Sequence, residues 1–233
     1  MNFRDRHVVV TGGTGALGLA VVDALLQSGA WCHVPTRGET SIERSPHRGN
    51  ALVSFVAVGD LADESAVTRF YAGLTGLWAS IHIAGAFAAA PIARGDKALL
   101  MGQIESNLVS AYNCSRAAAM TFRRLGSGGR IVNVAARQAL EPRLGTGSVA
   151  YTIAKSGVAA LTTALGAELA KEGVLVNAVA PSIMDTPGNR QSMPDADAAS
   201  WPKVEEVAAT ILFLASPQNT VTRGAIVPVY GKS

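Results

Sequence analysis

Short apolar runs alternate with amphipathic stretches along the whole chain. The apolar runs predict strands at 7–10, 30–36, 51–58, 77–84, 130–135, 174–179 and 225–229. The amphipathic stretches predict helices at 16–28, 63–74, 96–125, 203–215 and from the region of Tyr151 to Lys171. Strands that alternate with helices are typical of βαβ units. The pattern therefore predicts one doubly wound, Rossmann-like α/β domain, with a parallel sheet of about seven strands and helices on both faces.

Three segments lack this periodicity and are rich in glycine, proline, serine or charge. The segments 37–50 and 138–148 are predicted to be loops. The segment 182–202 is longer and irregular, and a segment of this kind usually forms a functional lid or a disordered loop. We expect a lid there, within a single domain that spans 1–233.

The amino-acid composition indicates a globular domain and gives no sign of nucleic-acid binding. With 233 residues, 48% of them hydrophobic and 16% charged, the chain has enough apolar side chains for one large core. The low charge indicates either surface buried between subunits or alanine-rich helices. The net charge is +3, and the 20 lysines and arginines are scattered, so nucleic-acid binding is not expected.

The cysteines and histidines give no sign of a metal site. Cys32 and Cys114 are the only cysteines, and they lie far apart, so we expect two buried free thiols and no disulfide. The four histidines form no spaced set. The apolar segments 7–10 and 81–93 are too short for a signal peptide core and a membrane span, respectively. A cytoplasmic protein without a membrane partner is the expectation.

A glycine-rich run follows the first predicted strand and precedes the first predicted helix. Gly13, Gly15 and Gly18 have the spacing of the dinucleotide fingerprint. In that position, free backbone N–H groups and the positive end of the helix accept a pyrophosphate, and glycines let the ligand approach closely. A tight turn without a ligand is the alternative.

Tyr151 and Lys155 stand four residues apart, so they share one face of a helix. A phenol has a reference pKa of about 10, and an ammonium nearby favours the phenolate. The pair alone also fits a solvated helix face. Together with the glycine run it predicts a nucleotide-dependent reductase, in which Lys155 lowers the pKa of Tyr151.

With these two motifs, the chain resembles the short-chain dehydrogenase/reductase family over nearly its whole length. Asp60-Leu61 resembles the family's adenine contact, although Asp60 also fits a helix N-cap. Ala84-Gly85 resembles the end of the family's Asn-Asn-Ala-Gly motif, with His82 and Ile83 in place of the asparagines.

The resemblance implies roles for further residues. Asn107 matches the asparagine that organises a relay water, or else it braces a neighbouring strand. Lys155 is expected to hold the nicotinamide ribose. The resemblance implies that the cofactor contacts Gly12, Thr14, Gly15, Ala16, Leu17, Gly18, Arg37, Asp60, Leu61, Ala84, Gly85, Tyr151, Lys155, Pro181, Ile183 and Thr186.

One departure from the family concerns the fifth predicted strand. The family normally ends this strand with a serine that polarises the substrate carbonyl, and Ala136 stands there instead. Ser148 is a candidate substitute. The quinonoid dihydropteridine reductases, a group within the family, also lack this serine, and their glycine loop and the segment 185–197 resemble this chain. An electron-poor pterin needs less help from a hydrogen-bond donor than a ketone does.

The end of the second predicted strand bears on the choice of cofactor. An acidic residue there binds the ribose 2′-hydroxyl, whereas an arginine accommodates a 2′-phosphate. This chain has Thr36-Arg37, with no acid before Glu39. NADP(H) is therefore favoured and NAD(H) remains possible, although Arg37 also fits a solvated loop cation.

These observations predict an oxidoreductase that transfers a hydride between NADP(H) and a small carbonyl or imine-like substrate. Tyr151, Lys155 and Asn107 are the expected catalytic residues. A dihydropteridine-reductase-like enzyme and a catalytically silent nucleotide-binding protein are the alternatives. The family resemblance implies a homodimer or homotetramer.

Overall fold

The computed structural model describes residues 1–233. Seven parallel strands form one sheet in the order β3-β2-β1-β4-β5-β6-β7. The strands are β1 (His7–Thr11), β2 (Trp31–Thr36), β3 (Val53–Ala57), β4 (Ala79–His82), β5 (Gly129–Val134), β6 (Val174–Pro181) and β7 (Ile226–Val229). The strand order reverses between β1 and β4, and ligands of doubly wound folds bind at such a point. The predicted fold class is confirmed.

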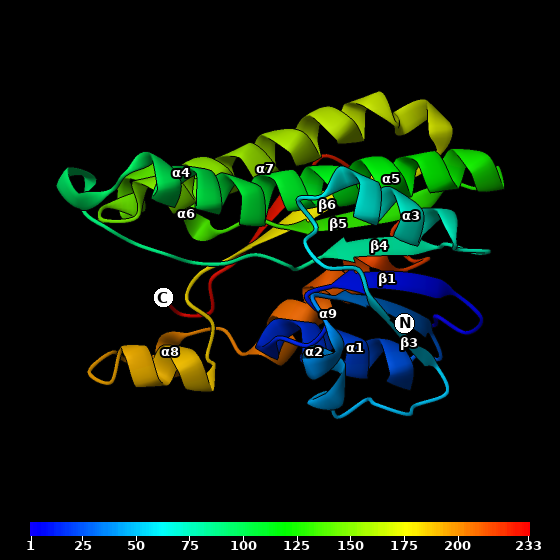
Figure 1. Ribbon diagram of the computed structural model, residues 1–233, viewed down its shortest axis with the longest axis horizontal. Coiled ribbons are helices and arrows are strands. Elements are labelled where there is room, and N and C mark those ends of the chain that lie inside the picture. The colour runs from blue at the N-terminus through cyan, green and yellow to red at the C-terminus, as the bar shows by residue number, and fades with distance from the viewer.

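Helices cover both faces of the sheet (Figure 1). One face carries α1 (Ala16–Gln27) and α9 (Val204–Ala215), and the other carries α3 (Glu64–Ala72), α5 (Ser110–Leu125) and α7 (Val149–Glu168). The shorter elements are α2 (Glu39–Glu43), η1 (Ile92–Arg94), α4 (Lys97–Gln103), η2 (Ile104–Val109), α6 (Arg137–Leu140), η3 (Pro142–Gly145), η4 (Ala170–Glu172), α8 (Pro187–Ser192) and η5 (Ala198–Ser200). None of the helices combines the length and the apolar character that a membrane crossing requires.

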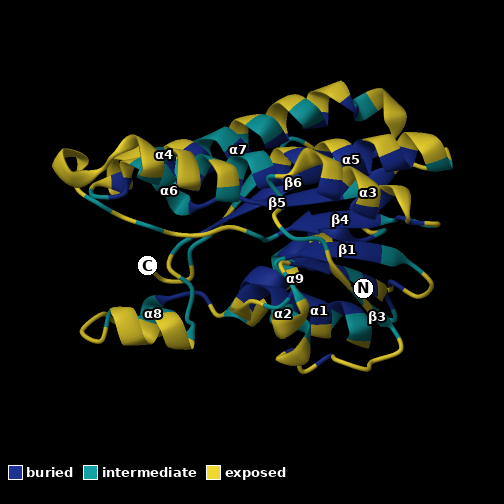
Figure 2. Ribbon diagram, viewed as in Figure 1, coloured by how far each residue is buried: buried dark blue, intermediate teal, exposed yellow.

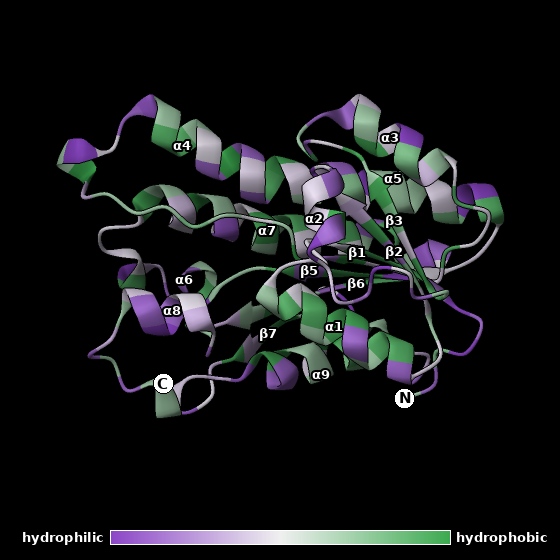
Figure 3. Ribbon diagram, turned by 60° about the horizontal axis from the view of Figure 1, so that its bottom comes forward, coloured by the Kyte–Doolittle hydropathy of each residue, from purple (hydrophilic) through white to green (hydrophobic).

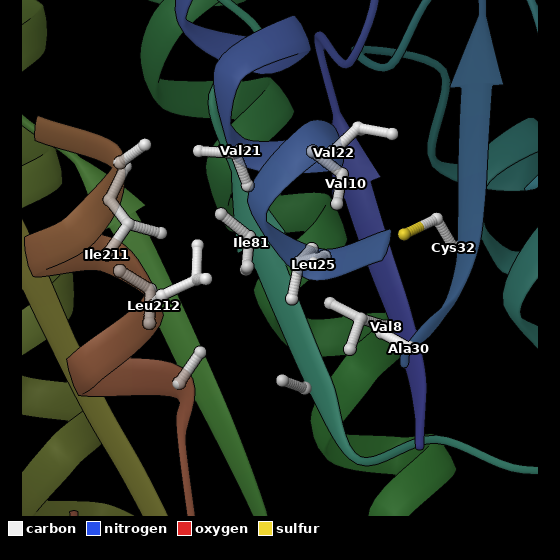
Figure 4. Packing of buried hydrophobic residues seen from close by; sticks show 14 of the residues in the cluster. Val8, Val10, Val21, Val22, Leu25, Ala30, Cys32, Ile81, Ile211 and Leu212 are labelled. Carbon is white, nitrogen blue, oxygen red and sulfur yellow. The ribbon is translucent and has the colours of Figure 1, made fainter. Parts of the chain in front are cut away.

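The core lies in two layers, one on each side of the sheet. A cluster of 21 buried residues joins α1 and α9 to the strands, and Figure 4 shows Val21, Leu25 and Ile211 pointing toward the strand residues Val10 and Ile81. A second cluster of 15 buried residues joins α3 and α5 to the other face. The central strands β1, β4, β5 and β6 are buried along nearly their whole length, the edge strands β3 and β7 are partly exposed, and the outer sides of the helices are exposed (Figure 2). Figure 3 shows the strands mainly in the green of apolar residues. Helices on both faces of a parallel sheet explain why its central strands appear in the sequence as continuous apolar runs.

The long helix predicted at 96–125 is interrupted. It consists of α4, the π-helical turn η2 and α5 in direct succession. A π-turn inserts one extra residue and is frequently found at functional sites. The helical periodicity of the sequence does not predict this π-turn, because the residues before it and after it both follow α-helical spacing.

Other boundaries also differ from the sequence-based expectation. The segment 37–50 contains α2, and the segment 138–148 contains α6 and η3. Helix α7 ends at Glu168 and does not reach 171, because Gly173 adopts a left-handed conformation with a φ of 71° and turns the chain toward β6. The segment 182–202 is ordered into α8 and η5. Helix α8 begins at Pro187, and the hydroxyl of Thr186 caps it by accepting from the backbone N–H of Asn189.

Both cysteines are free and buried, as expected. Burial raises the pKa of each thiol to about 12. At neutral pH, Cys32 and Cys114 are therefore protonated apolar packing groups.

Candidate active site

The glycine-rich turn connects β1 to α1 at the reversal point of the sheet. Gly12 has a φ of 68°, and a Cβ there would lie 2.8 Å from the backbone nitrogen of Ala84, which follows β4. A Cβ on Gly18 would collide with the carbonyl oxygen of Gly12. The hydroxyl of Thr11 accepts a hydrogen bond from the N–H of Ala84 at 3.2 Å. Glycine is therefore required at both positions for the close approach of the turn, β4 and α1.

A cavity of about 240 Å³ lies beside this turn. Its lining includes the sequence-predicted residues Gly12, Thr14, Arg37, Asp60, Leu61, Ala84 and Gly85. It also includes Ser41, which lies in α2. Ser41 was not predicted from the sequence, because the composition of the segment 37–50 predicts a loop and gives no sign of a helix. The N-cap of α3 is Asp63 and not Asp60, so the N-cap interpretation of Asp60 is wrong. The carboxylate of Asp60 instead accepts from the N–H of Ala62 at 2.9 Å and shapes the turn at the cavity wall.

A second cavity, of about 200 Å³, shares Gly85 and Ala86 with the first, so the two form one continuous cleft. The sequence-predicted residues in its lining are Leu17, Gly85, Asn107, Tyr151, Lys155 and Pro181. Gly15, Ala16, Gly18, Ile183 and Thr186 lie outside both linings. Gly15 is the N-cap of α1 and Ala16 its first residue, so both shape the turn beneath the cleft. The fold thus brings the glycine turn and the Tyr151–Lys155 pair to opposite ends of the same cleft.

Burial controls the ionisation of Tyr151 and Lys155. The Nζ of Lys155 donates to the carbonyl oxygen of Val134 at 2.8 Å and lies 5.8 Å from the centre of the Tyr151 ring. Burial lowers the pKa of Lys155 to about 8 and raises the pKa of Tyr151 to about 12. Burial thus holds the pKa of Tyr151 above its usual range even with the Lys155 ammonium nearby, and a lowering of that pKa by Lys155 stays a prediction. At neutral pH the phenol is protonated and suited to give a proton.

Asn107 lies in the π-turn η2. Its amide nitrogen donates to the carbonyl oxygens of Ala86 at 2.8 Å and Gln103 at 3.1 Å, so it braces the segment that follows β4. Its Oδ1 is buried without a protein partner, next to Gly85 and Lys155. An unpaired buried acceptor costs about 1–3 kcal/mol. A π-turn with an unpaired acceptor in the cleft is typical of a functional position.

Ala136 follows β5 and lies in the same cavity as Tyr151, with 4% of its surface exposed. Ser148 does not belong to this cavity's lining, and its hydroxyl donates to the carbonyl oxygen of Gly145. Ser148 is therefore no substitute for the missing serine. The remaining hydroxyl in the lining belongs to Ser182, and it donates to the carbonyl oxygen of Tyr230 at 2.9 Å.

A buried hydrogen-bond chain runs beneath the cleft from α3 to α7. The amide nitrogen of Asn133 donates to Thr162 at 3.0 Å, so its Oδ1 accepts from the Nδ1–H of His82 at 2.8 Å. The Nε2 of His82 then accepts from Ser80 at 2.8 Å, and the hydroxyl of Tyr71 donates to Ser80 at 2.7 Å. His82 is thus neutral and braces the strand ends, and burial lowers its pKa to about 4.

This lowered pKa should make stability depend on pH. The unfolded state takes up a proton on His82 below pH 6.5, whereas the folded state does so only below about pH 4. The stability that neutral His82 gives to the folded state is therefore fully present above pH 6.5. It is lost as the pH falls from 6.5 toward 4, and the free energy of unfolding should be about 2 kcal/mol lower at pH 5. Replacing His82 by Asn, the residue the family resemblance suggests, should remove that loss.

The measurement is urea unfolding of the native chain and His82→Asn at pH 7 and pH 5. Burial also lowers the pKa of His33, but His33 is common to both proteins and cancels from the comparison. Equal losses of unfolding free energy in both proteins would show that His82 is not responsible.

The comparisons with known proteins agree with this geometry. The family model described as short chain dehydrogenase matches residues 6–197. Galactitol 2-dehydrogenase from Rhizobium johnstonii is 32% identical over 96% of this chain and 93% of its own. L-xylulose reductase from Bos taurus is 30% identical over 99% of this chain and 97% of its own. The solved structure of ElxO with NADP bound matches the fold with a TM-score of 0.89 at 23% identity, over 97% of each chain.

A parallel sheet with a glycine turn at its reversal point and a Tyr–Lys helix on the same cleft defines a dinucleotide-binding oxidoreductase. The matches cover most of the chain, and this protein belongs to the short-chain dehydrogenase family of NAD(P)-dependent oxidoreductases. The sequence-based recognition of the family is confirmed.

Proposed function

We propose that this protein transfers a hydride between NADP(H) and a small carbonyl or imine-like compound. The observation that carries the proposal is the convergence of Tyr151, Lys155 and Asn107 on a cavity that continues into the one beside the glycine turn. The close backbone approach at Gly12 and Gly18 fits a pyrophosphate. When bound, the dinucleotide supplies or accepts the hydride.

In the reducing direction, the substrate carbon gains the hydride and its oxygen gains the proton of the Tyr151 hydroxyl, so C=O becomes CH–OH. A pKa of about 12 keeps that proton in place at neutral pH. Lys155, with a pKa of about 8, is largely cationic and holds the ribose of the dinucleotide. The free Oδ1 of Asn107 accepts from a relay water that restores the proton. Together these groups serve general acid–base catalysis.

Oxidation of NADPH, followed at 340 nm with a panel of ketones, aldehydes and quinonoid dihydropterin, tests this function. The absence of a serine at Ala136 favours the pterin alternative, because that acceptor needs less polarisation. Turnover of the pterin alone would establish the alternative. Binding of NADPH without any turnover would support the silent nucleotide-binding protein.

The preference for NADP(H) rests on Arg37. Arg37 and Ser41 line the cleft beside the end of β2, and no carboxylate of the segment 37–50 lines it with them. A guanidinium and a hydroxyl suit a 2′-phosphate, which a carboxylate would repel. The residues at the end of β2 therefore favour the phosphorylated cofactor.

Replacing Arg37 by Asp should reverse this preference, because the carboxylate accepts from the ribose hydroxyls and repels the phosphate. We expect the ratio of kcat/KM for NADPH to that for NADH to fall by about 100-fold, which corresponds to about 3 kcal/mol of differential binding. Steady-state kinetics with both cofactors measures it, and Arg48→Asp on the exposed part of the same segment is the control. An unchanged ratio would remove Arg37 from cofactor selection.

We further propose a single domain over 1–233, in which the segment 182–202 closes over the substrate. The support is its position, since Ser182 and Met184 line the cleft, and an ion pair between Asp185 and Arg190 at 2.6 Å organises its start. We also propose a cytoplasmic homodimer or homotetramer. The half-exposed Tyr112 and Met120 on α5, beside α7, support an association through these helices.

A further inference from the structure

Phe87 is an exposed aromatic side chain at the active-site mouth. It lies between β4 and η1 with 63% of its surface exposed, and it does not belong to the buried apolar core. Its ring packs edge-to-face on Tyr151, with the ring centres 4.9 Å apart and the planes at 80°. A large apolar side chain held in solvent beside the proton donor contributes little to the core. An exposed apolar surface next to a reacting group is typical of ligand recognition.

The cavity around Tyr151 offers a substrate few hydrogen-bond partners. No Asp, Glu, Arg or His lines it. The hydroxyl of Ser182 is bonded to Tyr230, the amide of Asn107 to Ala86 and Gln103, and the ammonium of Lys155 to Val134. Two side chains of the lining keep free donors: Tyr151 has its hydroxyl, and Lys155 has two N–H groups that the proposed function assigns to the ribose of the dinucleotide. The other walls facing Tyr151 are apolar, formed by side chains such as Phe87, Ala136 and Met184.

The arginine that adjoins this wall in the sequence, Arg137, is already neutralised. Arg137 follows Ala136 directly, but its guanidinium is paired with Glu141 at 3.1 Å and stacks on the ring of Tyr230 at 4.6 Å. Arg137 could bind an anionic substrate only if it broke its contacts with Glu141 and Tyr230.

From these contacts we propose that the substrate is an uncharged, flat aryl ketone and that Phe87 is the residue that selects it. The inference rests on the proposed function and names its substrate class. The ketone oxygen takes the donor that is left for the substrate, the Tyr151 hydroxyl, and the aryl ring packs against Phe87. Aromatic pairs contribute beyond their buried area, and one such pair is worth about 3- to 10-fold in affinity.

A polyhydroxylated substrate fits this cavity poorly. Each hydroxyl that is buried without a partner costs about 10-fold or more in affinity. The relatives named for galactitol and L-xylulose are named for compounds with several hydroxyl groups. The apolar cavity wall of this chain therefore indicates a substrate that is less polar than the compounds in those names.

The test compares acetophenone with acetylcyclohexane, which has the same skeleton without the flat ring, and with L-xylulose. The native enzyme should prefer acetophenone over acetylcyclohexane by about 3- to 10-fold in kcat/KM, mainly through KM. L-Xylulose should be poorer than acetophenone by about 100-fold or more, which corresponds to two unpaired hydroxyls.

Phe87→Leu should bring the ratio for the two ketones close to one, and Phe87→Tyr should restore it. The ratio is the readout because Phe87 also packs on Tyr151, and any misplacement of Tyr151 slows both ketones alike. Phe213→Leu on α9 makes the same change at another exposed phenylalanine outside the cleft and should leave the ratio intact.

An unchanged ratio in Phe87→Leu, or a preference for L-xylulose, would overturn the inference while the oxidoreductase function stands. If NADPH quenches tryptophan fluorescence but no carbonyl compound or pterin is reduced, the proposed function itself fails. The two failures are therefore distinguishable.

Discussion

Tyr151→Phe should lose most turnover and keep cofactor affinity. The phenylalanine ring can keep the edge-to-face contact with Phe87 at 4.9 Å, so the cleft should retain its shape. Only the hydroxyl is lost, and with it the proton that reduction of a carbonyl requires. General acid catalysis contributes about 10²- to 10⁴-fold in rate, so kcat should fall by that factor.

Steady-state kinetics gives kcat, and quenching of tryptophan fluorescence by NADPH gives the dissociation constant. Tyr112→Phe is the matched control, because Tyr112 lies half-exposed on α5 outside the cleft. Its kcat should equal that of the native enzyme. If Tyr151→Phe kept a near-normal kcat, Tyr151 would have no part in proton transfer.

Ala136→Ser should raise kcat/KM on simple ketones. Ala136 lies with Tyr151 in the lining of one cavity, so a hydroxyl there can reach the same substrate oxygen. One well-placed donor to a developing oxyanion is worth roughly 3 kcal/mol, or about 100-fold. An electron-poor quinonoid acceptor needs less of this help, so its rate should stay flat or fall.

Ala135→Ser is the control for position, because Ala135 lines the same cavity one residue earlier. A gain restricted to Ala136→Ser identifies the place of the missing donor. If neither serine changes the rate on any ketone or pterin, Ala136 does not face the reacting centre.

Local patterns of residues are enough to predict the class of fold and the family. Apolar runs that alternate with amphipathic stretches predict a covered parallel sheet, because strands buried on both faces have no polar side. The glycine spacing and the Tyr151–Lys155 spacing each span only a few residues, so both motifs can be recognised in the sequence alone. The matches over most of the chain confirm what these patterns predicted.

The electrostatics and the details of the cleft depend on how the elements pack together. The sequence suggested a lowered pKa for Tyr151, but burial raises it, and burial depends on everything packed around a group. The π-turn at Asn107 and the contact of Phe87 with Tyr151 leave no periodic signal. Phe87 and Tyr151 are distant in sequence and meet only because the segment that follows β4 reaches the helix α7. Contacts of this kind are set by packing between elements, which no local pattern of residues encodes.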